Sequence, residues 1–118
     1  MLHDLQIALS RLASSDLQQK YCLNGTKDGY LLPEELLSSA EDWVEIVSAS
    51  SLLTSHQLAS IKKFQQSLDE VSNELDRLFE LGGKGPTHTL SSNAWLHARE
   101  AAARCLAELG LDVRVDML

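Results

Sequence analysis

The chain has 118 residues and 44% of them are hydrophobic, which suffices for one hydrophobic core without disulfides or a structural metal. We therefore expect one helical domain over residues 1–118. The formal net charge of −7 argues against nucleic-acid binding, because contacts with phosphates are made largely by Lys and Arg, and it favours a cationic partner.

The N-terminal residues and the two cysteines indicate a cellular compartment. Asp4, Gln6 and Arg11 interrupt the apolar residues at the N-terminus, so the pattern of a secretory signal is missing. No stretch approaches the ~20 apolar residues that a membrane-spanning helix needs. Cys22 and Cys105 are too far apart and too few for a disulfide framework, so we expect two reduced core thiols. The sequence predicts a cytoplasmic protein that does not bind membranes.

Residue usage favours helices along the whole chain. Leu, Ala, Glu, Gln, Lys and Arg dominate, while runs of β-branched residues are nearly absent and only two prolines occur. The sequence therefore predicts an all-α fold, a single-domain bundle of about four helices with a long central helix.

The first helix is expected from about Leu2 to Leu23. Three polar residues, Ser14 to Asp16, can weaken or break it, because such side chains compete for backbone hydrogen bonds. Asn24 and Gly25 then end the helix. Its inner side is predicted to carry Leu2, Leu5, Leu9, Leu12 and Tyr21.

A second helix is expected from Pro33 to about Val47. Proline suits the first helical position, where its missing N–H would be unpaired in any case. The apolar residues fall on one side of this helix, namely Leu36, Ala40, Trp43, Val44 and Val47. The carboxylates gather on the other side, namely Glu34, Glu35, Glu41, Asp42 and Glu45. No Lys or Arg lies between Asp28 and Leu58, so this acidic side is uncompensated.

The long central helix is expected from Thr54 to Leu81. Thr54 and Gln57 have the spacing of a reciprocal N-terminal cap, and Gly82 and Gly83 can end the helix. One stripe is apolar and consists of Leu58, Ile61, Phe64, Leu68, Val71, Leu75, Leu78 and Phe79. The acidic residues lie toward its end, an order that opposes the helix dipole; they are Asp69, Glu70, Glu74, Asp76 and Glu80.

A flexible loop is expected over residues 82–91, because it contains three glycines and a proline. Ser92 or a neighbour should cap a last helix that stops at Gly110. Its inner face is predicted to carry Trp95, Leu96, Ala98, Ala102, Cys105, Leu106 and Leu109. The alternating tail from Leu111 to Leu118 can be either a short strand or an extended segment.

No catalytic or metal-binding motif occurs in the sequence. The serines lack a nucleophile-elbow pattern, no glycine-rich phosphate loop is followed by Lys, and the four histidines are scattered singly. We therefore expect no enzyme, no cofactor and no metal.

Residues 24–35 nevertheless resemble the spacing of an EF-hand calcium loop. Asp28 and Glu35 would supply charged ligands and Gly29 the sharp turn. Asn at the first position, Pro33 inside the loop and the lack of a second loop argue against calcium, so this site remains an alternative to an ordinary turn between helices.

The uncompensated acidic side is the main candidate for a binding surface. Clustered like charges cost stability, and such surfaces accelerate the capture of an oppositely charged partner. Tyr30 lies beside it in the sequence and is a candidate aromatic anchor. The predicted partner-binding residues are Asp28, Tyr30, Glu34, Glu35, Glu41, Asp42 and Glu45. A solvated helix face is the other interpretation.

One stretch also carries a resemblance to a known class of proteins. The run from Gly25 to Leu36, followed by Leu53, Thr54 and Gln57 and then by the Trp95 helix, resembles small all-helical bacterial immunity proteins of polymorphic or contact-dependent toxin systems. The resemblance implies a non-enzymatic inhibitor that binds a toxin domain, often a cationic nuclease, with acidic side chains that imitate phosphates.

The leading hypothesis is therefore an immunity protein that neutralises a cognate basic toxin through an acidic surface. Two other classes remain open: a calcium-binding module that uses residues 24–35, and a structural bundle that dimerises through apolar surface on the long helix.

Overall fold

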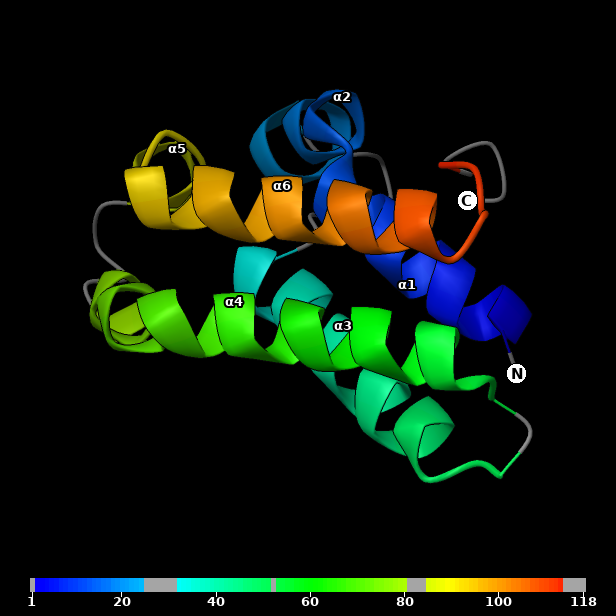
Figure 1. Cartoon of the computed structure of the whole chain (residues 1–118). Coiled ribbons are helices and arrows are strands. Elements are labelled where there is room, and N and C mark those ends of the chain that lie inside the picture. Colours follow the sequence, from blue (N-terminus) through cyan, green and yellow to red (C-terminus); the bar gives the residue numbers. More distant parts are fainter. Residues whose placement is uncertain (1, 25–31, 52, 81–84, 114–118) are drawn as a thin grey trace.

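A computed structural model of the chain describes residues 2–24, 32–51, 53–80 and 85–113 (Figure 1). Within these residues the fold is all-α and has no strand, as the composition predicted. The elements in chain order are α1 (Leu2–Ala13), α2 (Ser15–Gln18), the π-helix η1 (Gln19–Asn24), α3 (Pro33–Ser48), α4 (Ser55–Glu80), α5 (Gly85–Leu90) and α6 (Asn93–Glu108). The expected count of about four helices is too low for the described part, because short helices form where one long helix and one loop were expected.

The helix expected from Leu2 to Leu23 is divided into three elements. α1 ends at Ala13, and Ser14 adopts an extended backbone and accepts a 3.1 Å hydrogen bond from the main-chain N–H of Leu17. This bond caps α2, since a helix start leaves N–H groups unpaired. The break therefore occurs at the polar run that the sequence analysis marked as weak.

α3 and α4 begin as their sequences predicted. Pro33 occupies the start of α3. Ahead of α4, the N–H of Thr54 donates to Gln57 Oε1 at 2.9 Å, and the N–H of Gln57 donates to Thr54 Oγ1 at 3.1 Å. This reciprocal pair fixes where the helix begins. α4 has 26 residues and is about 39 Å long at a rise of 1.5 Å per residue.

The segment expected to be a flexible loop over residues 82–91 contains α5, so the expectation of a loop is wrong for Gly85–Leu90. Ser92 then caps α6, with its Oγ accepting from the N–H of Trp95 at 3.1 Å. At the other end Gly110 has a φ of +73°, which L side chains rarely adopt. The N–H of Leu111 donates to the carbonyl of Leu106 at 2.9 Å and closes the last turn.

The long helices pack around one shared core. α6 lies against both α4 and α1, and α3 contacts α1 and, less extensively, α4 (Figure 1). α6 packs extensively against two of the other long helices, and α4 is the longest of the described helices. The largest fully buried side chains come from every long helix and include Leu5, Leu9, Val44, Ile61, Phe64, Leu75, Trp95 and Leu106.

Most of the predicted inward residues whose side chains are described are buried, and others are partly buried, namely Leu2, Trp43, Leu58, Val71, Leu78, Phe79 and Leu109. The side chain of Tyr21 lies outside the described part. Leu96 is 42% exposed, so its assignment to the inner face of α6 is wrong. Trp43 is only half-buried, at the edge of the α3 core face. Cys22 and Cys105 are free, buried thiols, as expected.

Several expectations fall outside the described residues. They concern the turn with Asp28 and Tyr30, most of the 24–35 loop, the cap at Gly82 and Gly83, and residues 114–118 of the tail. The described start of the tail, residues 111–113, has no regular secondary structure. It is held to α1 by a 2.8 Å hydrogen bond that Gln6 Nε2 donates to the carbonyl of Asp112.

Candidate functional site

α3 distributes its acidic side chains over two sides of the helix. Glu41 and Glu45 face α4, whereas Glu34, Glu35 and Asp42 lie around a separate shallow hollow. The sequence analysis had placed these five carboxylates on one face of the helix. A helical projection of α3 alone cannot show that α4 packs beside only part of that face. The remaining two predicted site residues, Asp28 and Tyr30, lie outside the described part of the chain.

The larger depression is a groove between α3 and α4 with a volume of about 680 Å³. Its floor is apolar and consists of Leu37, Val44, Phe64, Leu68 and Leu75. Its walls carry four carboxylates and two uncharged polar side chains, namely Glu41, Glu45, Asp69, Asp76, Gln65 and Ser72. We call this set of residues the acidic groove.

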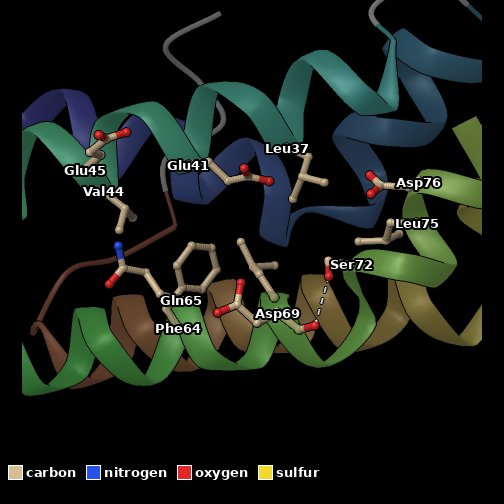
Figure 2. Close-up of a pocket in the computed structure, with 11 residues that line it drawn as sticks. Leu37, Glu41, Val44, Glu45, Phe64, Gln65, Asp69, Ser72, Leu75 and Asp76 are labelled. Carbon is tan, nitrogen blue, oxygen red and sulfur yellow. Dashed lines mark hydrogen bonds between the residues drawn. The ribbon is translucent and has the colours of Figure 1, made fainter.

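Figure 2 shows how the carboxylates of the acidic groove are placed. Glu41 and Glu45 come from α3 on one wall, and Asp69 and Asp76 come from α4 on the other. The Ser72 hydroxyl donates a 3.0 Å hydrogen bond to the main-chain carbonyl of Asp69 and so turns toward its own helix (Figure 2). No Lys or Arg occurs among the residues that line the groove. The walls therefore present negative charge from two helices, and none of the described residues that line them is a cation.

The environment of Glu41 is the clearest electrostatic sign of this crowding. Partial burial raises the pKa of its carboxyl above the ordinary value, and the negative charges of Asp42, Asp76 and Asp69 raise it further. Two of these three neighbours belong to the opposite wall on α4. A cation seated between the walls would relieve the repulsion that raises this pKa.

Sequence reasoning missed the α4 half of the acidic groove. In the sequence, Asp69 and Asp76 stand out only as acids toward the end of a helix, where the dipole disfavours negative charge. That unfavourable placement was the available signal. This placement of the acids is informative only together with the tertiary structure, in which α3 and α4 lie side by side.

The hollow on the other side of α3 is smaller, with a volume of about 350 Å³. Half-buried Trp43 lies there with Asp42 and the two glutamates of the first turn of α3. Ile46 is 52% exposed and one turn further along the helix. This side offers an aromatic and an aliphatic side chain beside acids, but the hollow is more open than the acidic groove.

Comparisons with known proteins add no relative. No family model, no curated protein and no solved structure matches the chain. The site is therefore interpreted from its own geometry.

The chemistry available in the acidic groove is that of clustered anions above an apolar floor. Among the described residues, no group of three or more His, Cys, Asp or Glu side chains is arranged to hold a metal ion. Carboxylates pair well with guanidinium and ammonium groups, and the floor can cover their aliphatic stems. In the same described part, no helix has the length and apolar character needed to cross a membrane.

Proposed function

We propose that this protein is a non-enzymatic, cytoplasmic protein-binding protein that captures a basic partner in the acidic groove. In its most specific form, the proposal is that the protein is an immunity protein that neutralises a cognate basic toxin. Nucleases are one class of toxin that fits. The groove belongs to a bundle whose longest helix, α4, supplies one wall and whose α3 supplies the other.

One observation carries the proposal: four carboxylates from two helices line a groove that contains no basic side chain. Their mutual repulsion disfavours the free protein, and a cationic partner removes it. The formal net charge of −7 adds a long-range attraction for such a partner, which accelerates association. A nuclease fits this chemistry, because its site for phosphates attracts other clustered anions.

The test compares two variants with the same change in net charge. In the groove variant, Glu41, Glu45 and Asp69 are replaced by Lys. In the control variant, the exposed residues Glu74, Glu80 and Glu100, which do not line the groove, are replaced by Lys. Circular dichroism first checks that both variants keep the helical content of the parent chain.

Each chain is then immobilised and incubated at low salt with lysate of the native host, and the retained proteins are identified by mass spectrometry. We expect the parent and the control variant to retain the same basic protein, which elevated salt releases because salt screens exposed charges. The groove variant should lose it. Retention by the groove variant at the parent's level would show that the acidic groove is not the binding surface.

A second measurement addresses the immunity function itself. The retained protein is expressed alone and together with the parent chain or either variant, and cell growth is recorded. We expect growth to stop when it is expressed alone or with the groove variant, and to continue with the parent and the control variant. A retained protein that is harmless on its own would refute toxin neutralisation while leaving the binding surface in place.

A further inference from the structure

The residues that line the acidic groove follow the spacing of a helix-packing seam. On α3 they step from Leu37 to Glu41 and then to Val44 and Glu45. On α4 they step in threes and fours from Phe64 to Asp76. Side chains spaced three and four residues apart form ridges and grooves on a helix surface, and a third helix can pack into the groove between two such surfaces. Within the described bundle α3 and α4 leave this seam unfilled, so its geometry suits a helix.

The carboxylates match the axial repeat of such a helix. Asp69 and Asp76 are seven residues apart on α4, which is about 10.5 Å along the axis, or two turns. Glu41 and Glu45 on the facing wall are four residues apart, about 6 Å along α3. A helix lying in the groove would place its residues i, i+4 and i+7 on one side. Residues i and i+4 would be about 6 Å apart along the axis and residues i and i+7 about 10.5 Å apart, as the wall carboxylates are.

The occupant must be cationic and must come from another protein. A second copy of this chain also carries a net charge of −7, so its approach would add like charge to the walls. The ten Lys and Arg residues of the chain nowhere occur as three basic residues at i, i+3 or i+4, and i+7. Neither a copy nor a segment of the chain itself therefore has the required charge pattern.

Arginine fits this groove better than lysine. Its guanidinium pairs with a carboxylate through two parallel hydrogen bonds, whereas the lysine ammonium acts as a point charge. Its aliphatic stem can cover the apolar floor that Leu37, Phe64 and Leu75 form between the walls.

We propose that the acidic groove seats one helix of the basic partner, whose arginines at i, i+4 and i+7 pair with Asp69, Glu41 and Asp76 in that order. This inference rests on the proposed function and specifies the element that the partner inserts. It assigns to α3 and α4 the role of two walls around a third helix supplied in trans.

The test uses synthetic peptides of about 15 residues, long enough for an Ala-rich sequence to form a helix. The first carries three arginines at i, i+4 and i+7. The second has the same composition with its arginines at i, i+5 and i+10, so that they point to three different faces. The third keeps the first pattern but has a proline at its centre, which breaks the helix. Fluorescence anisotropy measures binding of each to the full chain.

Three protein variants complete the design. The neutral groove variant has Glu41→Gln, Asp69→Asn and Asp76→Asn, and its control has Glu74→Gln, Glu80→Gln and Glu100→Gln, with an equal change in charge. Ser72→Trp fills the groove without changing its charge, since Ser72 lines the wall between the two aspartates. Circular dichroism verifies that each variant is folded.

We expect the first peptide to bind about tenfold more tightly than the second or third, as three partly exposed ion pairs can supply. The neutral groove variant and Ser72→Trp should each lose this preference, and the control should keep it. Equal binding of all three peptides, or an unchanged preference in Ser72→Trp, would overturn the proposal of a helix in the groove.

The two proposals fail in distinguishable ways. If the captured basic protein depends on the groove carboxylates while the peptides bind alike, the partner uses a loop or a flat surface, and only the helix inference is wrong. If the groove variant retains the basic protein as the parent does, the binding surface itself is wrongly assigned.

Discussion

The indole Nε1 of Trp95 donates a hydrogen bond of 3.0 Å to Gln18 Oε1, 77 positions away in the sequence. The Gln18 amide nitrogen donates in turn to the main-chain carbonyls of Arg11 and Leu12, at 3.0 and 2.7 Å. Gln18 and Trp95 are both fully buried. One side chain thus pairs the last carbonyls of α1 and fastens them to α6, which explains how a buried amide is tolerated here.

Replacement of Gln18 by Leu should lower the free energy of unfolding by about 2–3 kcal/mol, because the indole N–H and a buried carbonyl lose their partners. Urea denaturation followed by circular dichroism measures the loss. Gln19→Leu is the control, since Gln19 is exposed and a change within about 0.5 kcal/mol is expected there. In a double-mutant cycle with Trp95→Phe, a coupling below about 0.3 kcal/mol would show that the bond contributes nothing.

The end of α6 should depend on the backbone of Gly110. Its φ of +73° disfavours any residue with a Cβ, although no atom lies within 4 Å of the position that a Cβ would take. Gly110→Ala is therefore expected to cost about 1 kcal/mol from conformation alone. Gly110→Asn should cost less, because Asn tolerates the left-handed region. Thermal unfolding compares the two variants, and equal losses would point to an effect other than backbone conformation.

Leu75 and Leu96 should respond very differently to truncation. Leu75 is 1% exposed beneath the acidic groove, so Leu75→Ala is expected to cost about 2–5 kcal/mol. Leu96 is 42% exposed on α6, so Leu96→Ala should change stability by about 0.5 kcal/mol or less. Chemical denaturation distinguishes the two. A large loss at Leu96 would mean that it points inward, as its sequence position had suggested.

Both cysteines should be inert in the folded protein. Burial, and then the charge of Glu35, raises the pKa of Cys22 to about 11, and burial, and then the charge of Glu108, raises that of Cys105 to about 12. Since the thiolate is the reactive form, we expect no rapid reaction with a disulfide reagent at pH 8. Both thiols should react at once in denaturant. Fast labelling of the native chain would contradict the burial of these side chains.

Glu41 should make stability depend on pH in a defined direction. Its folded-state pKa lies above the ordinary 4.5, chiefly through burial, with Asp42, Asp76 and Asp69 adding to the rise. The folded state then holds more protons than the unfolded state in the window above 4.5, so stability falls as pH rises through that window. Glu41→Gln removes this penalty and should stabilise the chain at pH 7 by less than about 1 kcal/mol, because solvent screens a partly exposed group.

The gain from Glu41→Gln should disappear below pH 4.5, where the carboxyl is protonated in both states. Denaturation at several pH values measures it, beside Glu74→Gln on the same helix, whose residue is exposed and outside the groove. A loss of stability at neutral pH in Glu41→Gln would mean that the carboxylate has a favourable partner.

Local signals in the sequence located most helix ends. Pro33, the Thr54 and Gln57 pair, Ser92 and Gly110 act through bonds or backbone angles within a few residues, so their effects are visible in a short window. The same window could not show that residues 85–90 form a short helix, because Gly and Pro there favour a loop and only the surrounding packing overrides them. Leu96 was misplaced because a hydrophobic residue beside the true face fits the periodicity nearly as well.

The sequence by itself determined the all-α class, the two free cysteines and the acidic composition of α3, since residue usage and cysteine spacing suffice for these. Only the tertiary structure decided that Glu41 and Glu45 lie apart from the other acids of α3. They line one groove together with Asp69 and Asp76 of α4. The physical reason is that a charge pattern is a property of one helix, whereas a groove depends on how far two helices separate. That separation is set by the side chains packed between them and against α6 and α1.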